Sequence, residues 1–542
     1  MNNRIVFIFI LIITLSIIGC KKEEITEVTE RIENTVVQRV EADSLLSQPI
    51  TVNYNPSGIA PLTAELKINT QVSSSISITV LGKNPISKSF YTMAKSHTIP
   101  VLGLYPDTLN KVLVTINTAN QAGQQIIEIQ TDSVSEYLPE VVITKANKAL
   151  MEPGLNFNNI LLTDGANFWF YPMAYDYNGD IRWYFDFESK GLYQGFRSPL
   201  ELTDEGNLLF EADDKVVEYD MMGNLLKSVP LPSGFSHAHH DVIKIPNGNY
   251  VVAVSKDGST IDYQGSTYST VEDCMIEING TTGALVREWD FKNILDIYRA
   301  NLAGTITGNV ADWFHQNAVV QDPADGNYIV SGRNQGLIKV NQNNELLWVM
   351  APHLGWGNAG INGNGYAIDS LLLTALDQQG SPLSQAIQDG TQSSLSFEWQ
   401  WGQHAPLVLP NGNILVFDNG FNRYFSNTSS PFSRAVEYEI DETNMTVKQV
   451  WAYGESRGAD CFSPIISDVD YLPNTGNILF SPGIMFDPVQ QNSKIIEVTR
   501  PGGNVVFEGQ LNFKSVRGGS PTPVFGQIDI TYRTERMKLY QD

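Results

Sequence analysis

A repeated unit constrains this chain more than any other feature of its sequence. In each copy an apolar strand leads into a turn resembling Pro-Asn-Gly-Asn, and a second apolar strand follows. The turns begin at Thr203, Pro246, Pro323, Pro410 and Pro473. Repeats of this kind stack on their neighbours, and a closed ring of them leaves no long strand edge exposed.

A second motif alternates with the first, and it consists of a strand, a Gly or Asn turn and a strand that is often rich in aromatic residues. Its six copies lie at 175–185, 219–229, 277–289, 340–349, 438–453 and 497–509. One copy of each motif makes a four-stranded blade. The pattern predicts an all-β fold, a six-bladed β-propeller over residues 141–542. We expect the insertions at 296–312 and 355–398 to cover one mouth of the ring.

The segment before the repeat has a different pattern. Residues 49–140 alternate apolar and polar side chains, and turn residues recur about every ten positions. This pattern predicts a small N-terminal Ig-like β-sandwich domain.

The N-terminus predicts export. Arg4 precedes an apolar run that ends in Leu-Ser-Ile-Ile-Gly-Cys, with the cysteine at position 20. We interpret residues 1–19 as a lipoprotein signal peptide, Cys20 as the lipidated residue and residues 20–48 as a tether. The predicted location is the bacterial cell envelope, with the lipid anchor on the periplasmic face of the outer membrane or on the cell surface.

Composition narrows the possible partners. The formal net charge of −24 argues against nucleic acid, whose phosphates require clustered lysine and arginine. After Cys20 the chain has two more cysteines, Cys274 and Cys461, and their spacing leaves a disulfide between them open. Neither has the spacing of a zinc ligand.

Histidines occupy one phase of the repeat. His240 and His404 each lie six residues before the proline of the turn, and His315 fills the matching place in a third copy. Arg197 and Ser467 hold the same position in two further copies. A ring would bring these side chains together at one end of its axis.

Such a cluster suits an anionic group. Arginine matches tetrahedral oxyanions with a planar fork, and a neutral imidazole is a nucleophile or an acid–base group. Arg333, eighteen residues after His315, would add the charge for sulfuryl or phosphoryl transfer. A zinc site of three histidines is an alternative, although a cationic arginine beside it is unfavourable. The sequence has no phosphate loop and no dinucleotide fingerprint.

Three stretches, 239–241, 312–340 and 402–413, together resemble the bacterial arylsulfate sulfotransferase family. They contain His-His-Asp, then Asp-Trp-Phe-His-Gln-Asn followed by Ser-Gly-Arg-Asn-Gln-Gly, and Gly-Gln-His-Ala-Pro. The resemblance covers about residues 50–540. It implies a small β-domain before a six-bladed propeller. It also implies transfer of a sulfuryl group from a phenolic sulfate ester to another phenol through a sulfated histidine, without a nucleotide sulfate donor.

The resemblance also implies roles for individual residues. His404 would be the nucleophile, while His240, His315 and Arg333 would bind the sulfuryl oxygens and one histidine would protonate the leaving phenolate. Asn317 would orient the group beside His315. His239 competes with His240, but the phase of the repeat favours His240.

The remaining expectations concern substrate contacts and partners. Ser463 and Ser467 are candidates for a hydroxyl contact, and Arg197 is a further candidate for substrate binding. Arg423 is either a second anion contact or a surface charge. The aromatic residues beside these positions would stack on an aryl group or pack in the core; they are Trp313, Phe314, Trp399, Trp401, Phe421 and Tyr424.

The expected partners are small aryl sulfates and phenols, with no cofactor, no metal, no nucleic acid and membrane contact through the lipid only. A homodimer is left open. Two other functions compete with sulfuryl transfer. One is a non-catalytic, lipid-anchored propeller that binds sulfated or phenolic ligands, and the other is a metal-dependent hydrolase or lyase.

Overall fold

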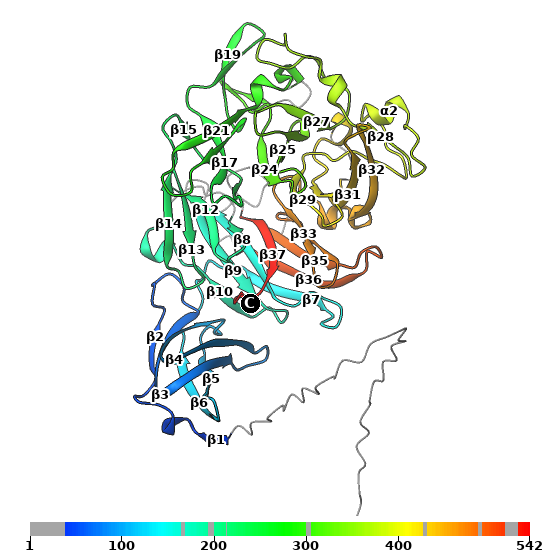
Figure 1. Ribbon diagram of the computed structural model, residues 1–542. Helices are drawn as coiled ribbons and strands as arrows, with labels where there is room; N and C mark the ends of the chain where they lie inside the picture. The colour runs from blue at the N-terminus through cyan, green and yellow to red at the C-terminus, as the bar shows by residue number, and fades with distance from the viewer. Residues whose placement is uncertain are drawn as a thin grey trace, which may run out of the picture.

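The computed structural model describes residues 38–541, except for 164–167, 193–199, 213, 300–304, 427–430, 486–489 and 515–528. It is an all-β protein in which a small N-terminal domain adjoins a larger body of sheets (Figure 1). The expected signal peptide, Cys20 and most of the expected tether lie outside the described residues. Within the part that is described, none of the helices has the length and apolar character needed to cross a bilayer.

The N-terminal domain is a six-stranded sheet in the order β1-β6-β5-β3-β2, with β4 also paired to β3. Its strands are β1 (Gln38–Glu41), β2 (Thr51–Tyr54), β3 (Thr63–Val80), β4 (Ile86–Leu102), β5 (Leu109–Asn117) and β6 (Gln121–Gln130). Burial alternates along β3, as the sequence pattern predicts. β1 pairs in parallel with β6, and η1 (Ala42–Ser44) follows it, so the last residues of the expected tether belong to this domain.

Within the described residues, the larger body contains six sheets, and each is built around four antiparallel strands. A separate small sheet is described below. The first is β10 (Ile181–Tyr184), β9 (Phe168–Tyr175), β8 (Leu155–Thr163) and β37 (Ile530–Met537). The second is β11 (Glu201–Leu202), β12 (Leu208–Ala212), β13 (Lys215–Tyr219) and β14 (Leu225–Pro230). The third is β16 (Val242–Lys244), β17 (Tyr250–Lys256), β20 (Cys274–Ile278) and β21 (Leu285–Asp290), with β15 (Phe235–Ser236) also on β17.

The remaining three sheets follow in chain order. The fourth is β24 (Gln316–Gln321), β25 (Tyr328–Gly332), β26 (Gly336–Val340) and β27 (Leu346–Met350). The fifth is β29 (His404–Val408), β30 (Ile414–Asp418), β31 (Arg434–Asp441) and β32 (Thr446–Tyr453), with β28 (Thr374–Ala375) beyond β32. The sixth is β33 (Asp468–Leu472), β34 (Asn477–Ser481), β35 (Asn492–Val498), β36 (Val505–Asn512) and β7 (Glu140–Ala146).

Neighbouring sheets pack on one another through their apolar faces. The first strands of successive sheets lie side by side at β16 and β24, at β24 and β29, and at β29 and β33, and β12 of the second sheet lies beside β16 of the third. The first two sheets share a core that includes Phe170 and Phe210. β37 belongs to the first sheet but also contacts β33, β34 and β35 of the sixth, so the last strand of the chain joins the two ends of the series.

The expected insertions carry short elements of their own. They include η3 (Phe291–Asn293), η4 (Ile297–Arg299), η5 (Ile368–Leu371) and α2 (Gln385–Gln388). A small sheet combines β18 (Thr260–Tyr263), β19 (Ser266–Thr270), β22 (Ile306–Thr307) and β23 (Val310–Ala311). Figure 1 shows β19 and α2 at the end of the molecule farthest from the N-terminal domain. The turns η2 (Glu188–Lys190), η6 (Arg423–Phe425) and η7 (Glu455–Cys461) lie outside these insertions.

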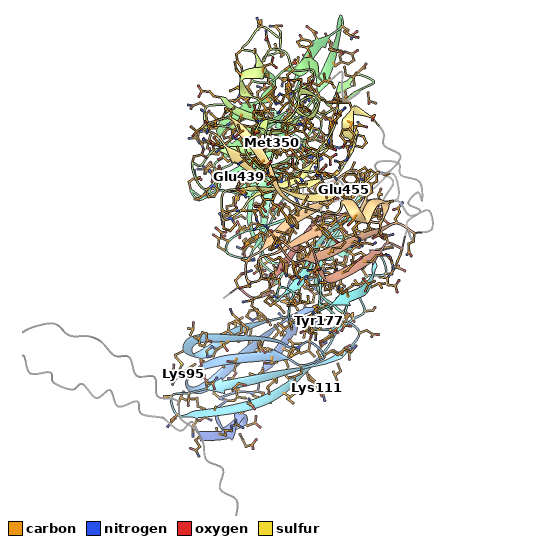
Figure 2. All side chains as sticks on the ribbon, turned by 90° about the vertical axis from the view of Figure 1, so that its right-hand side faces the viewer. Lys95, Lys111, Tyr177, Met350, Glu439 and Glu455 are labelled. Atoms are coloured by element: carbon orange, nitrogen blue, oxygen red, sulfur yellow. The ribbon has the colours of Figure 1, made fainter. Side chains whose placement is uncertain are left out.

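The N-terminal domain is docked on the first and sixth sheets. One apolar core includes Leu66 and Val112 of the domain together with Tyr175 and Phe507 of those sheets. At the same junction the buried Arg182 donates to Gly103 O at 2.7 Å. In Figure 2, Tyr177 lies between Lys95 and Lys111 on the small domain and Met350 on the larger body. The two cysteines in the described part of the chain, Cys274 and Cys461, are buried and unpaired, so they do not form a disulfide.

Candidate active site

Three of the phased histidines come together at the start of neighbouring strands. His240 precedes β16, His315 precedes β24, and His404 is the first residue of β29. The ring centroids of His240 and His315 are 5.0 Å apart. β24 and β29 lie side by side, which brings His404 to the same place. His404 thus lies within electrostatic range of both His240 and His315.

The backbone is unusual at His240 and His315, and also at Ala405, which follows His404, and at Ser467. His240, His315, Ala405 and Ser467 have φ values of 60°, 55°, 50° and 89°, in the left-handed region that residues other than glycine rarely adopt. The strand register also shifts just after His315 and His404. Strained residues and β-bulges often occur beside functional sites, where they redirect a side chain.

Arg333 lies beside both His315 and His404. Its backbone N–H donates to His315 O at 2.9 Å. The side-chain amide of Gln403 donates to Gly332 O at 3.0 Å. Gln403 precedes His404 and Gly332 precedes Arg333, so this bond joins the segments of the two residues, and the charge of Arg333 lowers the pKa of His404.

The guanidinium of Arg333 has no carboxylate within ion-pair distance among the described residues, and its buried Nε has no hydrogen-bond partner there. The ring of Phe421 packs on it, with the guanidinium carbon 4.6 Å from the ring centroid. Burial lowers the pKa of Arg333, while Asp312 and Glu272 act in the opposite direction. A cation held in place by an aromatic ring and left without an anion is a site for a bound oxyanion.

His404 is held as a neutral imidazole, and its Nε2 has no hydrogen-bond partner among the described residues. Its Nδ1 lies 2.8 Å from Asn419 Oδ1 and 3.1 Å from Gly402 O. The Asn419 amide group donates to Ser463 O and Ile466 O, both at 2.8 Å, which fixes its oxygen toward His404. Both neighbours of Nδ1 are acceptors, so Nδ1 carries the proton and Nε2 has the lone pair. Burial, and then Arg333, hold the pKa of His404 well below its usual range.

His315 has the opposite environment. Its Nδ1 lies 2.6 Å from Asp312 Oδ2 and 2.8 Å from Glu272 Oε2. Burial would lower the pKa of His315, but these two carboxylates outweigh it and raise the pKa to about 9. His315 is therefore a cation at neutral pH.

His240 is neutral, like His404. Burial is the main cause that holds its pKa well below the usual range, and His315, His239 and Arg333 add to the effect. Its Nδ1 is 3.0 Å from His239 Nδ1 and 3.9 Å from Glu272 Oε1. The Nε2 of His239 is buried without a partner among the described residues. Of the two histidines, His240 is the one whose ring faces His315, as the phase of the repeat predicts.

The other predicted contact residues bind segments of the chain that carry the site residues. Asn317 donates to Gln403 O at 2.7 Å, so its amide braces the segment that carries His404. Ser467 Oγ donates to Ser463 Oγ at 2.8 Å and accepts from Gly483 N at 3.0 Å. Ser463 Oγ donates to Ile465 O at 3.1 Å and accepts from Ile484 N at 3.1 Å.

Both serine hydroxyls are thus engaged within their own loop, which is the loop that orients Asn419. A substrate contact by either serine stays a prediction. Arg197 lies outside the described residues.

One expectation about a neighbouring side chain needs correction, and for three others the structure decides between the two alternatives. Arg423 is neither an anion contact nor a surface charge, because it is buried and paired with Glu398 at 2.9 Å and Asp418 at 3.1 Å. Three of the aromatic residues are fully buried in the apolar cores, namely Trp313, Phe314 and Trp399.

Trp401 and Phe421 instead line a pocket beside Arg333, together with Phe425 and Gln400. This pocket is partly open to solvent. Aromatic walls next to an arginine suit an aryl group that bears an anion.

Sequence reasoning missed four residues at the site. Glu272 and Asp312 hold His315, and Asn419 holds His404. The ring of Tyr532 is 6.0 Å from that of His240, and its buried hydroxyl has no partner among the described residues. Asp312 lies within the motif that contains His315, so its position three residues earlier was a usable signal. Glu272 and Tyr532 come from distant segments, and no spacing points to them.

Two groups of side chains could hold a cation. His239, His240 and Glu272 offer ligand atoms within 4.8 Å of one another, and so do Glu272, Asp312 and His315. The unpaired charge of Arg333 lies next to both groups, and a second cation there would be repelled. The arrangement therefore suits an anion better than a metal ion.

The chain matches known proteins over both of its parts. A family model described as Arylsulfotransferase (ASST) matches residues 140–517. A second model, described as Arylsulfotransferase Ig-like domain, matches residues 51–133, which confirms the predicted Ig-like character of the N-terminal domain.

Two relatives are similar over most of their length. The arylsulfate sulfotransferase AssT of Lelliottia amnigena is 28% identical, and the match covers 90% of this chain and 89% of that protein. The arylsulfate sulfotransferase AssT of Escherichia coli O6:H1 is 27% identical, with coverage of 80% and 84%. A solved protein of unknown function from Bacteroides caccae is 15% identical, with a TM-score of 0.36 over 70% of this chain and 98% of its own, and a likeness this weak says nothing about function.

Proposed function

This chain belongs to the arylsulfotransferase family and is an enzyme of that type, and on this premise we propose that it transfers a sulfuryl group through a sulfated His404. The donor is a phenolic sulfate ester and the acceptor is a second phenol. No nucleotide sulfate takes part, and the sequence has neither a phosphate loop nor a dinucleotide fingerprint to bind one.

The pairing of His404 with Asn419 carries this proposal. Asn419 accepts from Nδ1 at 2.8 Å, so the lone pair of Nε2 is available, and no described residue competes for it. A neutral imidazole is required of a nucleophile, and burial together with Arg333 keeps the pKa of His404 low enough for that. Few structural roles need a buried histidine that is neutral, fixed in orientation and open at one nitrogen.

The groups around His404 would bind the sulfuryl oxygens. Arg333 offers donors that no carboxylate of the described chain neutralises, and His240 and His315, whose rings are 5.0 Å apart, also lie within electrostatic range of His404. Sulfuryl transfer develops charge at the equatorial oxygens, where fixed donors in a buried site stabilise it most strongly. The pocket beside Arg333 would receive the aryl group.

We further propose that the six sheets are the blades of a six-bladed β-propeller. Consecutive sheets pack on one another in chain order, and β37 connects the first sheet to the sixth. The three histidines begin the first strands of the third, fourth and fifth sheets. A closed ring places all such strands around one axis, which accounts for their convergence.

The test of the chemistry is intact-mass analysis after brief exposure to 4-nitrophenyl sulfate without an acceptor. We expect an adduct of one SO₃ on the wild type, its absence in His404→Ala, and its loss when a phenol is added. An adduct that persists in His404→Ala, or no adduct at all, contradicts the proposal. Release of 4-nitrophenol at an equal rate with and without a phenol would indicate hydrolysis instead of transfer.

The location at the cell envelope and the lipid on Cys20 remain proposals that depend on the N-terminal sequence. Metabolic labelling with a radioactive fatty acid tests them, and Cys20→Ala should abolish the label. A labelled Cys20→Ala protein would contradict the assignment. Whether the chain forms a homodimer is answered by light scattering of the protein without its signal peptide.

A further inference from the structure

Glu272 is a half-buried carboxylate, with 21% of its side chain exposed, and no step of the proposed transfer uses it. It lies in the short segment between β19 and β20. This segment contributes none of the predicted residues, but Glu272 lies beside two of the predicted histidines. Its two oxygens lie on different histidines, Oε2 at 2.8 Å from His315 Nδ1 and Oε1 at 3.9 Å from His240 Nδ1. Only the shorter of these distances lies well within ion-pair range, and the hydrogen bond of His315 Nδ1 goes to Asp312 Oδ2, so Glu272 acts on His315 through its charge.

The segment around Glu272 is fastened to the segment around His315. Gln316 N donates to Glu272 O at 2.8 Å, and the indole of Trp313 donates to Asp273 Oδ2 at 2.9 Å. Glu272 itself has a left-handed backbone, with φ 56°. These bonds fix the distance between Glu272 and His315, because neither segment can shift without breaking them.

We propose that Glu272 is a positioning residue which, together with Asp312, holds His315 as the proton donor to the departing phenol oxygen. The inference rests on the proposed function, and it assigns the acid among the three histidines. His240 lies farther from Glu272 and stays neutral, so it binds the sulfuryl group without giving up a proton. The Nε2 of His315 has no partner among the described residues and carries the proton that is transferred.

The proton and electron balance closes with the groups present. His404 Nε2 forms a bond to sulfur while the bond between sulfur and the aryl oxygen breaks, and the electron pair of that bond goes to the oxygen. His315 Nε2 gives its proton to the same oxygen and becomes neutral. In the second half an acceptor phenol attacks sulfur, its proton goes to His315 Nε2, and the electron pair of the nitrogen–sulfur bond returns to His404.

Charged and titratable groups face His315 from every neighbouring segment. The anions are Glu272 and Asp312, and the other groups are His239, His240, Arg333, His404 and Tyr532. Burial would raise the pKa of Glu272, but the charge of His315 holds it well below its usual range. The negative charge of Glu272 and the positive charge of His315 thus each stabilise the charged form of the other side chain.

The test compares two donors in Glu272→Gln. Phenyl sulfate releases a poor leaving group, whose phenol resembles tyrosine with a pKa near 10, whereas 4-nitrophenolate leaves with little need for an acid. We expect the loss in kcat/KM with phenyl sulfate to be at least about tenfold larger than the loss with 4-nitrophenyl sulfate. Glu272→Asp should recover part of the difference.

Glu288→Gln is the matched control, because Glu288 pairs with Lys256 at 2.5 Å on the outer strand β21 and its loss should leave the ratio of the two donors unchanged. Equal losses with both donors in Glu272→Gln would overturn the assignment. The sulfated adduct on His404 would still form in that case, so the proposed function would survive. If the wild type forms no adduct, both proposals fall.

A second measurement does not depend on whether Glu272→Gln folds. Histidine side chains labelled for NMR are titrated in the wild-type protein, and the resonance of His315 is identified by its absence in His315→Gln. We expect a pKa near 9 for His315. A His315 that is neutral at pH 7 would overturn the proposal whatever the variant shows.

Discussion

His404 and His315 begin equivalent strands in neighbouring sheets, but the structure surrounds them with opposite chemistry. The Nδ1 of His404 donates to the neutral amide of Asn419, while the Nδ1 of His315 is held by the carboxylates of Asp312 and Glu272. Burial affects both rings in the same direction. The partner of a single nitrogen therefore decides which imidazole is neutral and which is charged.

This difference shows how a repeat protein can build an asymmetric site. The strands place equivalent side chains at equal positions, and residues outside the repeat then assign each one its charge. A neutral and a charged imidazole, both near Arg333, supply a nucleophile and an acid at one pH. Substitutions that exchange or weaken the partners of the two Nδ1 atoms test this difference directly.

The largest effect is expected when His404 is given the partner type of His315. In Asn419→Asp a carboxylate would raise the pKa of His404, so about 1% of the ring would stay neutral at pH 7 if the pKa reached about 9. We expect kcat to fall about 100-fold at pH 7 and to recover as the pH rises toward 9. The measurement is the pH profile of transfer from 4-nitrophenyl sulfate to a phenol.

Asn419→Ala is the control for this substitution. It removes the same donors to Ser463 O and Ile466 O without adding a charge. Its activity should fall without a shift of the profile to higher pH. A profile for Asn419→Asp that coincides with that of Asn419→Ala would show that Asn419 does not set the charge of His404.

The next effect concerns stability. The pKa of His315 is raised from about 6.5 in the unfolded chain to about 9, so its ion pairs stabilise the fold fully below pH 6.5 and are lost as the pH rises through 9. Between about pH 7 and about pH 9.5 the wild type should lose about 2 kcal/mol of unfolding free energy. Chemical denaturation at several pH values measures this loss. His315→Gln should not show it, and an equal loss in both proteins would contradict the pairing.

A smaller effect is expected at Arg333, which lies between the two imidazoles. Phe421→Leu removes the ring that packs on the guanidinium. Cation–π contacts contribute about 1 kcal/mol when partly exposed, so we expect KM for the donor to rise about fivefold with little change in kcat. Phe425→Leu, in the same pocket but not stacked on Arg333, is the control. A fall in kcat alone would mean that the ring acts on the chemical step instead.

How much of this site the sequence could predict depends on where each residue lies in the repeat. His240, His315 and His404 share a phase, so closing the sheets brings them together, and Arg333 follows from its strand being paired with that of His315. Asn419 directly follows β30, as Arg333 follows β25, but an asparagine there gives no sign of its partner, and Glu272 lies in the segment between β19 and β20. Their effect on charge depends on distances of about 3 Å, which spacing in sequence does not encode.

The fold shows the same division. The strand–turn–strand units were visible because apolar alternation and turn residues are local signals. The completion of the first sheet by β37 was not visible, because its pairing with β8 joins residues at opposite ends of the chain. Arg423 was misjudged for a related reason, since its partners Asp418 and Glu398 come from separate segments.

The smallest effect is expected at Ser467, where sequence and structure suggest different roles. Its hydroxyl is engaged with Ser463 Oγ and Gly483 N, in the loop that holds Asn419 and through it His404. If this bracing is its role, Ser467→Ala should lower the unfolding free energy by about 1 kcal/mol while kcat falls less than about threefold. Thermal melts and steady-state rates measured on the same preparation separate the two. A loss of about 100-fold in kcat at unchanged stability would instead make Ser467 a direct contact of the sulfuryl group, with a rotated hydroxyl once substrate is bound.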